Sequence, residues 1–202
     1  MTLQKLSSSL LVASLLAGCA TTAGQSSVTA PMNSSDAPLS EPISAPRSLT
    51  VRSSEFADGA AIPAVHSFSG FGCAGQNTSP SLSWTGAPET ARSFAIIAHD
   101  PDAPTGVGFF HWLVFDIPAD TRELAAGATL PTGAIAGRTD FGSTAYGGPC
   151  PPPGSPHRYV FTVYALDVPS LGLTEPPSGA LLRFMLAQHT VAYGRLTGIF
   201  QR

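Results

Sequence analysis

Two short polar motifs carry the side chains with the most chemistry in this 202-residue chain. In the first, Asp100 is followed by a turn containing two prolines and then by His111. In the second, a run of glycine and proline leads to His157 and Tyr159. A carboxylate can fix the tautomer of a neighbouring histidine or keep it protonated, and imidazoles can donate hydrogen bonds to an anion. We therefore predict that Asp100, His111, His157 and Tyr159 converge on one pocket for a phosphate-like anion, with net positive character only when both histidines are protonated.

Strand ends would bring these side chains together. Residues 93–98, 111–116 and 158–166 are short apolar runs bounded by proline, glycine or polar residues, which is typical of β-strands. Asp100 lies where the first run ends, and His157 immediately precedes the third. Loops at strand ends are a common place for binding sites. The intervening residues, rich in glycine and proline, are expected to form long loops.

Prolines stiffen both motifs, so the site would be pre-formed at low entropic cost on binding. We expect five residues to support the two loops: Pro101, Asp102, Pro104, Gly148 and Pro149. Asp102 is expected to pair with an arginine or to cap its own turn rather than to contact a ligand. By strand alternation Arg158 faces away from His157 and Tyr159, so we expect it in a structural ion pair.

The same residues carry a resemblance. The segment 100–104, His111 and the segment 148–159 resemble the signature of the phosphatidylethanolamine-binding protein family. The segment 71–88 resembles the opening segment of the bacterial, Raf-kinase-inhibitor-like branch of that family, and the similarity covers about residue 50 to the end. The resemblance implies a mainly β fold, a β-sandwich with peripheral helices. It also implies that the pocket residues are Asp100, His111, His157 and Tyr159.

A C-terminal amphipathic helix is expected after residue 177. Ser178 suits the N-cap, and Gly194 is the expected stop. Six residues recur at helical spacing after Ser178 and would form one face of this helix: Leu182, Met185, Leu186, His189, Ala192 and Leu196. His189 lies on this stripe, so we expect it to be a hydrogen-bonded core residue. His66 and His99 have no comparable sequence context.

The first residues are typical of an exported protein. Lys5 precedes a short apolar run, residues 10–16, that is too short to span a bilayer as a permanent helix. Leu-Ala-Gly then leads to Cys19, a pattern that resembles the bacterial lipoprotein box. We predict that Cys19 is lipidated and anchors the protein in the cell envelope. Ala20, which follows the cysteine, favours a lipoprotein of the outer membrane that faces the periplasm. The alternative is an ordinary signal peptide whose cleavage leaves Cys19 unmodified.

Composition divides the chain into three parts. Beyond the leader, serine, threonine, alanine and proline dominate a segment that cannot bury enough apolar surface to offset its ordering entropy. The predicted divisions are a signal peptide at 1–18, a lipidated cysteine and disordered tether at 19–46, and one domain at 47–202.

Two further cysteines lie in glycine-bearing loops. Cys73 and Cys150 would meet an oxidising environment after export, which favours a disulfide between the two loops. The alternative is a pair of buried thiols.

Composition and motifs also restrict the function. A formal net charge of −3 argues against nucleic acid, which requires a basic face. The chain has no nucleophile elbow, zinc-protease motif, phosphate loop or dinucleotide fingerprint. We therefore predict non-enzymatic binding of phosphate or a phosphorylated headgroup such as phosphoethanolamine, without metal or cofactor. The resemblance leaves open an inhibitor of a partner protein such as a protease, and the carboxylate with two histidines leaves open a metal-dependent hydrolase.

Overall fold

The computed structural model describes residues 44–202. The predicted signal peptide, Cys19 and nearly all of the predicted tether lie outside these residues. Within the described part, no helix is both long and apolar enough to cross a bilayer.

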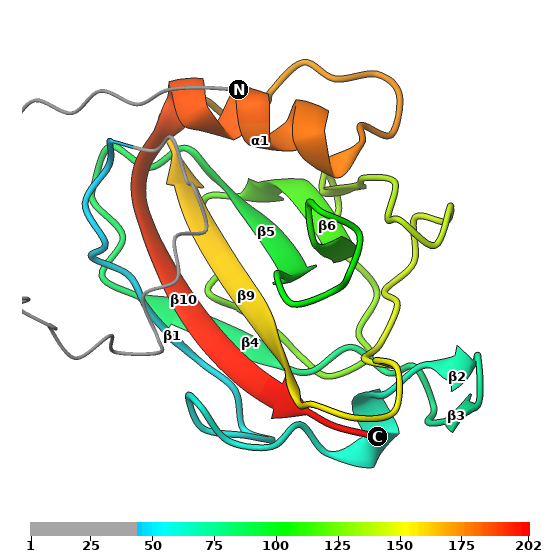
Figure 1. The fold of residues 1–202 in the computed structure, drawn as a ribbon. Helices are drawn as coiled ribbons and strands as arrows, with labels where there is room; N and C mark the ends of the chain where they lie inside the picture. Colours follow the sequence, from blue (N-terminus) through cyan, green and yellow to red (C-terminus); the bar gives the residue numbers. More distant parts are fainter. Residues whose placement is uncertain (1–43) are drawn as a thin grey trace, which may run out of the picture. The chain divides into compact units, whose positions relative to one another are not determined.

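Antiparallel sheets dominate the fold (Figure 1). The larger, five-stranded sheet has the order β10-β9-β5-β6-β8. Its strands are β5 (Ser93–Asp100), β6 (Phe109–Pro118), β8 (Ile135–Ala136), β9 (His157–Leu166) and β10 (Thr190–Phe200). A three-stranded sheet, β1-β4-β7, consists of β1 (Thr50–Arg52), β4 (Leu82–Thr85) and β7 (Glu123–Leu124). A small hairpin pairs β2 (Ser69–Gly70) with β3 (Cys73–Ala74).

Strand alternation divides the core into two layers. On β5, Phe94 and Ile96 face the smaller sheet, whereas Ala95 and Ile97 belong to a second cluster with residues of the helix α1 (Gly179–His189). Every residue of β5 is buried, because the strand is central in its sheet and covered on both faces. The expected mainly β sandwich is confirmed, with one α-helix and the short 3-10 turn η1 (Ala64–His66) among the described residues.

The helix is shorter than its sequence pattern predicted. Ser178 is the N-cap as expected, and its hydroxyl accepts a hydrogen bond from the amide of Leu181 at 3.3 Å. However, α1 ends at His189 and the chain continues directly into β10. Gly194 is therefore not a helix stop but a position within β10, where a Cβ atom would lie 2.3 Å from the carbonyl oxygen of Leu49.

His189 was also misplaced by that pattern. Its side chain is 32% exposed, and its Nδ1 lies 3.1 Å from Oδ1 of Asp167. The expected hydrogen bond exists, but it belongs to an ion pair at the surface rather than to the core.

Long loops occupy most of residues 117–156, interrupted by the two-residue strands β7 and β8. In Figure 1 the helix α1 lies at one end of the large sheet and the β2–β3 hairpin projects beyond the other.

Candidate ligand-binding site

Three strand ends meet where the sequence predicted a site. β5 lies between β6 and β9 and runs antiparallel to both, so its last residue lies beside the first residues of its neighbours. Asp100 ends β5, His111 lies near the start of β6, and His157 begins β9. Together with Tyr159, these side chains line one pocket of about 600 Å³.

Asp100 holds His157 and its own loop at the same time. Oδ2 of Asp100 lies 2.7 Å from Nδ1 of His157, and both residues are buried. Oδ1 accepts hydrogen bonds from the amides of Asp102 and Ala103 at 2.8 and 3.0 Å. Because an ionised carboxylate only accepts, Nδ1 of His157 carries a proton and Nε2 is the nitrogen left for a ligand.

A β-bulge directs His111 into the pocket. Ala98 pairs with Trp112, but the next residue of β5 pairs with Phe110, so His111 is the extra residue on β6. A bulge lets consecutive side chains share a face and is common beside functional sites. Here Trp112 joins the core between the sheets while His111 lines the pocket. No local pattern in residues 98–112 predicted this irregularity.

His111 is neutral near neutral pH. Its Nδ1 donates a hydrogen bond to the carbonyl oxygen of Gly147 at 2.7 Å, which leaves Nε2 as the nitrogen with the lone pair. Burial lowers the pKa of His111 below its ordinary value, although the carbonyl of Gly147 and the charge of Asp100 act in the opposite direction. At neutral pH His111 therefore does not carry one of the two protons that net positive character of the pocket would require.

Tyr159 contributes a buried hydroxyl without a partner. The residue is 2% exposed, and its ring meets the His111 ring edge-on with centroids 5.1 Å apart. The hydroxyl lies near Asp100 without hydrogen-bond geometry and has no hydrogen-bond partner among the described residues. Burial, followed by the charge of Asp100, raises the pKa of Tyr159 well above its usual range. At neutral pH Tyr159 is therefore a hydrogen-bond donor that lacks an acceptor.

Asp102 and Arg158 form the structural ion pair that the sequence suggested. The Asp102 carboxylate accepts from the amide, Nε and Nη2 of Arg158 at 2.8, 2.9 and 2.7 Å. The pair fixes the loop after β5 to the beginning of β9. Hydrogen bonds from Arg158 lower the pKa of Asp102, against the opposing effect of its partial burial.

The remaining supporting residues lie around the pocket but differ in their contacts. Pro104 lines it, and Pro101 lies in the same loop, half-buried. Gly148 donates its amide hydrogen to Oδ1 of Asn77 at 2.7 Å, and the carbonyl of Pro149 accepts from Phe68 at 3.0 Å. These bonds connect the second motif to the segment that carries the β2–β3 hairpin.

Four phenylalanines on one side of the pocket were not anticipated as site residues. This aromatic wall consists of Phe68, Phe71, Phe109 and Phe141. The rings of Phe68 and Phe141 stack with centroids 4.5 Å apart, and Phe109 meets Phe141 edge-on at 4.8 Å. The residues come from three separate segments, so no spacing in the sequence marks them. Asp140, which accepts from the amide of Phe110 at 2.7 Å, also lines the pocket.

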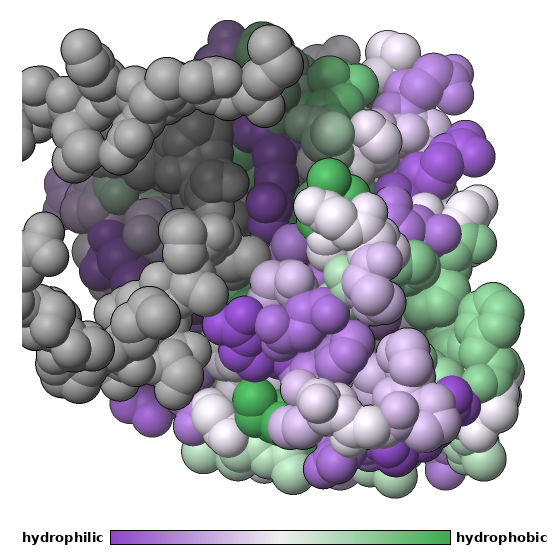
Figure 2. Space-filling view, in the orientation of Figure 1, coloured by the Kyte–Doolittle hydropathy of each residue, from purple (hydrophilic) through white to green (hydrophobic). Residues whose placement is uncertain are grey.

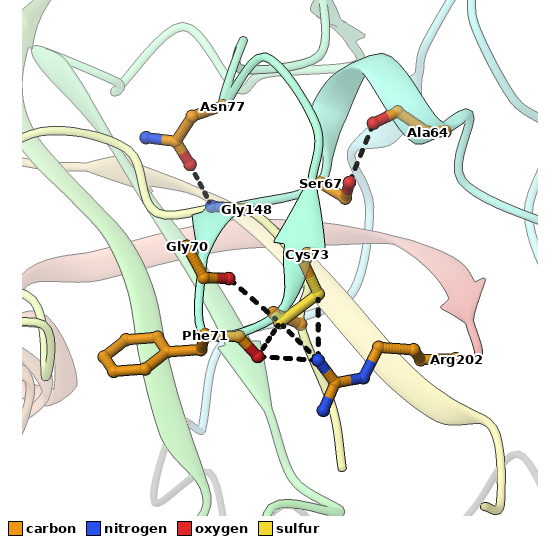
Figure 3. The surroundings of a disulfide bond; sticks show 9 residues. Ala64, Ser67, Gly70, Phe71, Cys73, Asn77, Gly148 and Arg202 are labelled. Carbon is orange, nitrogen blue, oxygen red and sulfur yellow. Dashed lines mark hydrogen bonds between the residues drawn. A yellow bond between two sulfur atoms is a disulfide. The ribbon is translucent and has the colours of Figure 1, made fainter. Parts of the chain in front are cut away.

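A disulfide joins Cys73 to Cys150 across the two loops (Figure 3). Cys73 lies on β3, and Cys150 lines the pocket. Figure 3 shows the guanidinium of Arg202 beside the disulfide, where Nη1 donates to the carbonyl oxygen of Phe71 at 2.6 Å. Among residues 44–202, no three His, Cys, Asp or Glu side chains form a group that could hold a metal ion.

Known proteins share this architecture. The UPF0098 protein YbcL of Escherichia coli is 46% identical over 158 residues, which cover 75% of this chain and 86% of that protein. Its crystal structure superposes with a TM-score of 0.74 over 77% of this chain and 99% of that chain. A putative phosphatidylethanolamine-binding protein homologue, CT736 of Chlamydia trachomatis, superposes with a TM-score of 0.68 at 32% identity, covering 77% of this chain and 99% of that one.

A third relative matches a longer part of the chain. The putative lipoprotein LppC of Mycobacterium tuberculosis is 35% identical over 189 residues, 92% of this chain and 90% of that protein. Residues 52–201 match the phosphatidylethanolamine-binding protein family as a whole. The sandwich, the matched residues and these relatives agree, and the chain belongs to the phosphatidylethanolamine-binding protein family.

Proposed function

We propose that the domain binds a small phosphate-like anion, either phosphate or a phosphorylated headgroup such as phosphoethanolamine, and that it does so without catalysis. The observation that carries this proposal is the buried hydroxyl of Tyr159, a residue of the pocket lining, which has no hydrogen-bond partner among the described residues. A buried donor left unpaired costs about 1–3 kcal/mol, so a ligand that supplies an acceptor gains from this site.

His157 completes the anion site. With Nδ1 bonded to Asp100, the imidazole can reach an anion only through Nε2, and it donates there when it carries both protons. Because His111 stays neutral, its Nε2 accepts rather than donates, which suits a ligand that also carries a hydroxyl or ammonium hydrogen.

Binding rather than chemistry suits these groups. Tyr159 keeps its proton at neutral pH because its pKa is raised, and the pocket lining includes no serine or lysine. Cys150, which also lines the pocket, is in a disulfide with Cys73 and so is not a free thiol. The family's name, which refers to phosphatidylethanolamine binding, supports the same class of ligand.

The test is isothermal titration of phosphoethanolamine against the protein and two variants. His157→Ala removes a charge-assisted hydrogen bond and should weaken binding by about 1.5–3 kcal/mol. Asp100→Asn should weaken it less, by about 1 kcal/mol, because the amide replaces the charge-assisted hydrogen bond that orients His157 with an ordinary one. Phosphorus NMR of the recovered ligand should show it unchanged.

The chain offers a matched control. His189 also pairs with an aspartate, Asp167, but at the exposed end of α1 and outside the pocket lining. His189→Ala should leave the affinity unchanged. If His157→Ala binds phosphoethanolamine as tightly as the unaltered protein, the anion site lies elsewhere.

We propose further that Cys19 carries a lipid that anchors the domain in the envelope, in the outer membrane facing the periplasm. The leader pattern at residues 16–19 supports this, as does a relative named as a putative lipoprotein whose similarity spans most of the chain. The divisions 1–18, 19–46 and 47–202 belong to the same proposal. Labelled palmitate should enter the protein and should be lost in Cys19→Ser. Incorporation that persists in that variant would contradict the assignment.

A further inference from the structure

The aromatic wall has a geometry that the anion site does not explain. Phe68 is stacked with Phe141 at an interplanar angle of 8° and with Phe71 at 16°, so the three rings are nearly parallel. Phe71 is 76% exposed although it lines the pocket. Its ring is therefore an aromatic surface that the protein itself leaves uncovered. Figure 2 shows hydrophobic surface on the side of the molecule where the β2–β3 hairpin projects in Figure 1.

Phe71 also occupies a backbone conformation that its side chain disfavours. It is the first residue of the two-residue turn between β2 and β3, with φ +50°, and Gly72 follows with φ +83°. A hairpin turn with positive φ at both positions usually has Asn-Gly or Gly-Gly there. A bulky residue with positive φ is an outlier, and such outliers concentrate at ligand sites. An exposed phenylalanine at this position stabilises neither the turn nor the core.

The hairpin is fixed in place despite its small size. β2 and β3 pair over only two positions, but Cys73 is bonded to Cys150 and Arg202 donates to the carbonyl of Phe71. A Cβ atom at Gly72 would lie 2.7 Å from Nη1 of Arg202, so a larger residue there would displace this guanidinium. Phe71 is thus held beside the pocket by one covalent and one charge-assisted contact.

The pocket is also larger than an anion needs. Its volume of about 600 Å³ falls within the range of about 300–1,000 Å³ that accommodates drug-sized ligands. One water molecule occupies about 30 Å³, so an anion of a few heavy atoms would fill only part of this space. The space beyond Asp100, His157 and Tyr159 is bounded mainly by the aromatic wall and by prolines.

We infer that the ligand is an aryl-substituted oxyanion, whose charged group binds at His157 and Tyr159 while its flat ring stacks on Phe71. This inference rests on the proposed function and adds the class of ligand. A flat ring on Phe71 adds the same kind of near-parallel stacking that joins Phe68 to both Phe71 and Phe141, whose own centroids are 6.4 Å apart, and a flexible alkyl chain does not reproduce it. An alkyl chain would be held by area alone and would lose more conformational freedom on binding.

Three phosphate monoesters of equal charge separate the contributions: methyl, phenyl and hexyl phosphate, the last with as many carbons in its alkyl group as phenyl. Isothermal titration should give phenyl phosphate an affinity at least about tenfold above that of methyl phosphate, the combined effect of ring burial and stacking. Phenyl phosphate should also bind more tightly than hexyl phosphate.

Phe71→Leu keeps the position apolar but removes the flat ring, so it should abolish most of the preference for phenyl while leaving methyl phosphate unaffected. Phe184→Leu is the control, because Phe184 is also exposed, at 64%, but lies on α1 outside the pocket lining. The circular dichroism of both variants should match that of the unaltered protein.

Each alternative outcome has a distinct meaning. If methyl phosphate binds through His157 but phenyl phosphate binds no more tightly, the aryl inference fails and the proposed function stands. If hexyl phosphate binds more tightly than phenyl phosphate and Phe71→Leu changes neither affinity, the wall serves acyl chains and the inference is overturned. If none of the three esters binds, both the inference and the proposed function fail.

Discussion

The disulfide between Cys73 and Cys150 should contribute a large share of the stability of this domain. A cross-link that spans 77 positions of sequence restricts the unfolded chain by an amount worth about 4.5 kcal/mol in the chain-entropy treatment. Measured contributions of disulfides are usually about 2–4 kcal/mol, because the reduced chain retains some compactness. We expect the double variant Cys73→Ser and Cys150→Ser to lose about 3–4 kcal/mol of unfolding free energy.

Two further contacts of the bridge favour the upper part of that range. Nη1 of Arg202 lies 3.8 Å from Sγ of Cys73 and 3.7 Å from Sγ of Cys150, and it donates to the carbonyl of Phe71. Loss of the bridge would loosen the β2–β3 hairpin and remove the contacts of this guanidinium with the two sulfur atoms. For a domain of about 150 residues or more, a loss of this size lowers the melting temperature by roughly 6–16 °C.

Urea unfolding with and without reductant measures the effect. The unaltered protein should be destabilised by reductant to about the level of the double serine variant, and that variant should not respond to reductant. Equal urea midpoints for the oxidised protein and the double variant would refute this expectation, because the disulfide would then add nothing to the free energy of unfolding.

Three smaller perturbations test the surroundings of the pocket. Asp102→Asn removes the charge that binds Arg158 and should lower the free energy of unfolding in urea by about 1–3 kcal/mol. Because the pKa of Asp102 is lowered in the folded protein, this stabilisation should be lost as the pH falls below 3.8. Equal stability of the variant and the unaltered protein at neutral pH would contradict the role of this ion pair. Gly148→Ala would place a Cβ atom 2.1 Å from the carbonyl oxygen of His66 and should cost about 1–3 kcal/mol or more, so an unchanged melting temperature would show that the backbone yields easily. Burial, followed by the charge of a nearby arginine, lowers the pKa of His99 from 6.5 to about 4. Between these two pH values the unfolded chain binds more protons than the folded protein, so the free energy of unfolding should fall by up to about 3 kcal/mol as the pH is lowered. His99→Gln should lack this part of the pH dependence of unfolding, and identical pH profiles would exclude the burial effect.

The strands that form the site were predictable because their sequence signals are local. Residues 94–98 are an uninterrupted apolar run that ends two residues before Asp100, and β9 begins directly after a proline. Apolar runs bounded by proline or glycine predict buried strands without knowledge of their partners. The antiparallel arrangement of these strands then brings Asp100 and His157 within hydrogen-bond distance.

The end of α1 could not be predicted in the same way. Ala192 and Leu196 fit a helix because they are four residues apart, but they fit a strand equally well because both are at even positions. The glycines between and beyond them, Gly194 and Gly198, resemble breakers, yet each provides space for another segment that crosses β10 closely. The pairing of β10 with β9, together with the close approach of Leu49 and Ile62, decides between the two structures, and no local pattern encodes these tertiary contacts.

The same distinction applies within the pocket. Asp100, His111, His157 and Tyr159 could be predicted because polar side chains in proline-rich motifs stand out in an otherwise apolar sequence. The aromatic wall could not, since a phenylalanine is ordinarily a core residue and gains its role here from a turn and a disulfide. The available signal was Phe71-Gly72 within a glycine-rich segment, because a bulky residue is unusual in a hairpin turn with positive φ.

The two sides of the pocket are therefore attached to the fold in different ways. Asp100 and Asp102 hold the consecutive residues His157 and Arg158, so the anion side cannot shift without displacing the start of β9 from the centre of the sheet. The aromatic side depends on a hairpin of two residue pairs, one disulfide and one arginine. Substitutions in that hairpin alter the surface offered to the ligand while leaving the charged side intact. Under the proposed function, the choice among ligands with the same anionic group would therefore depend on the hairpin, and the requirement for an anion on the strand ends.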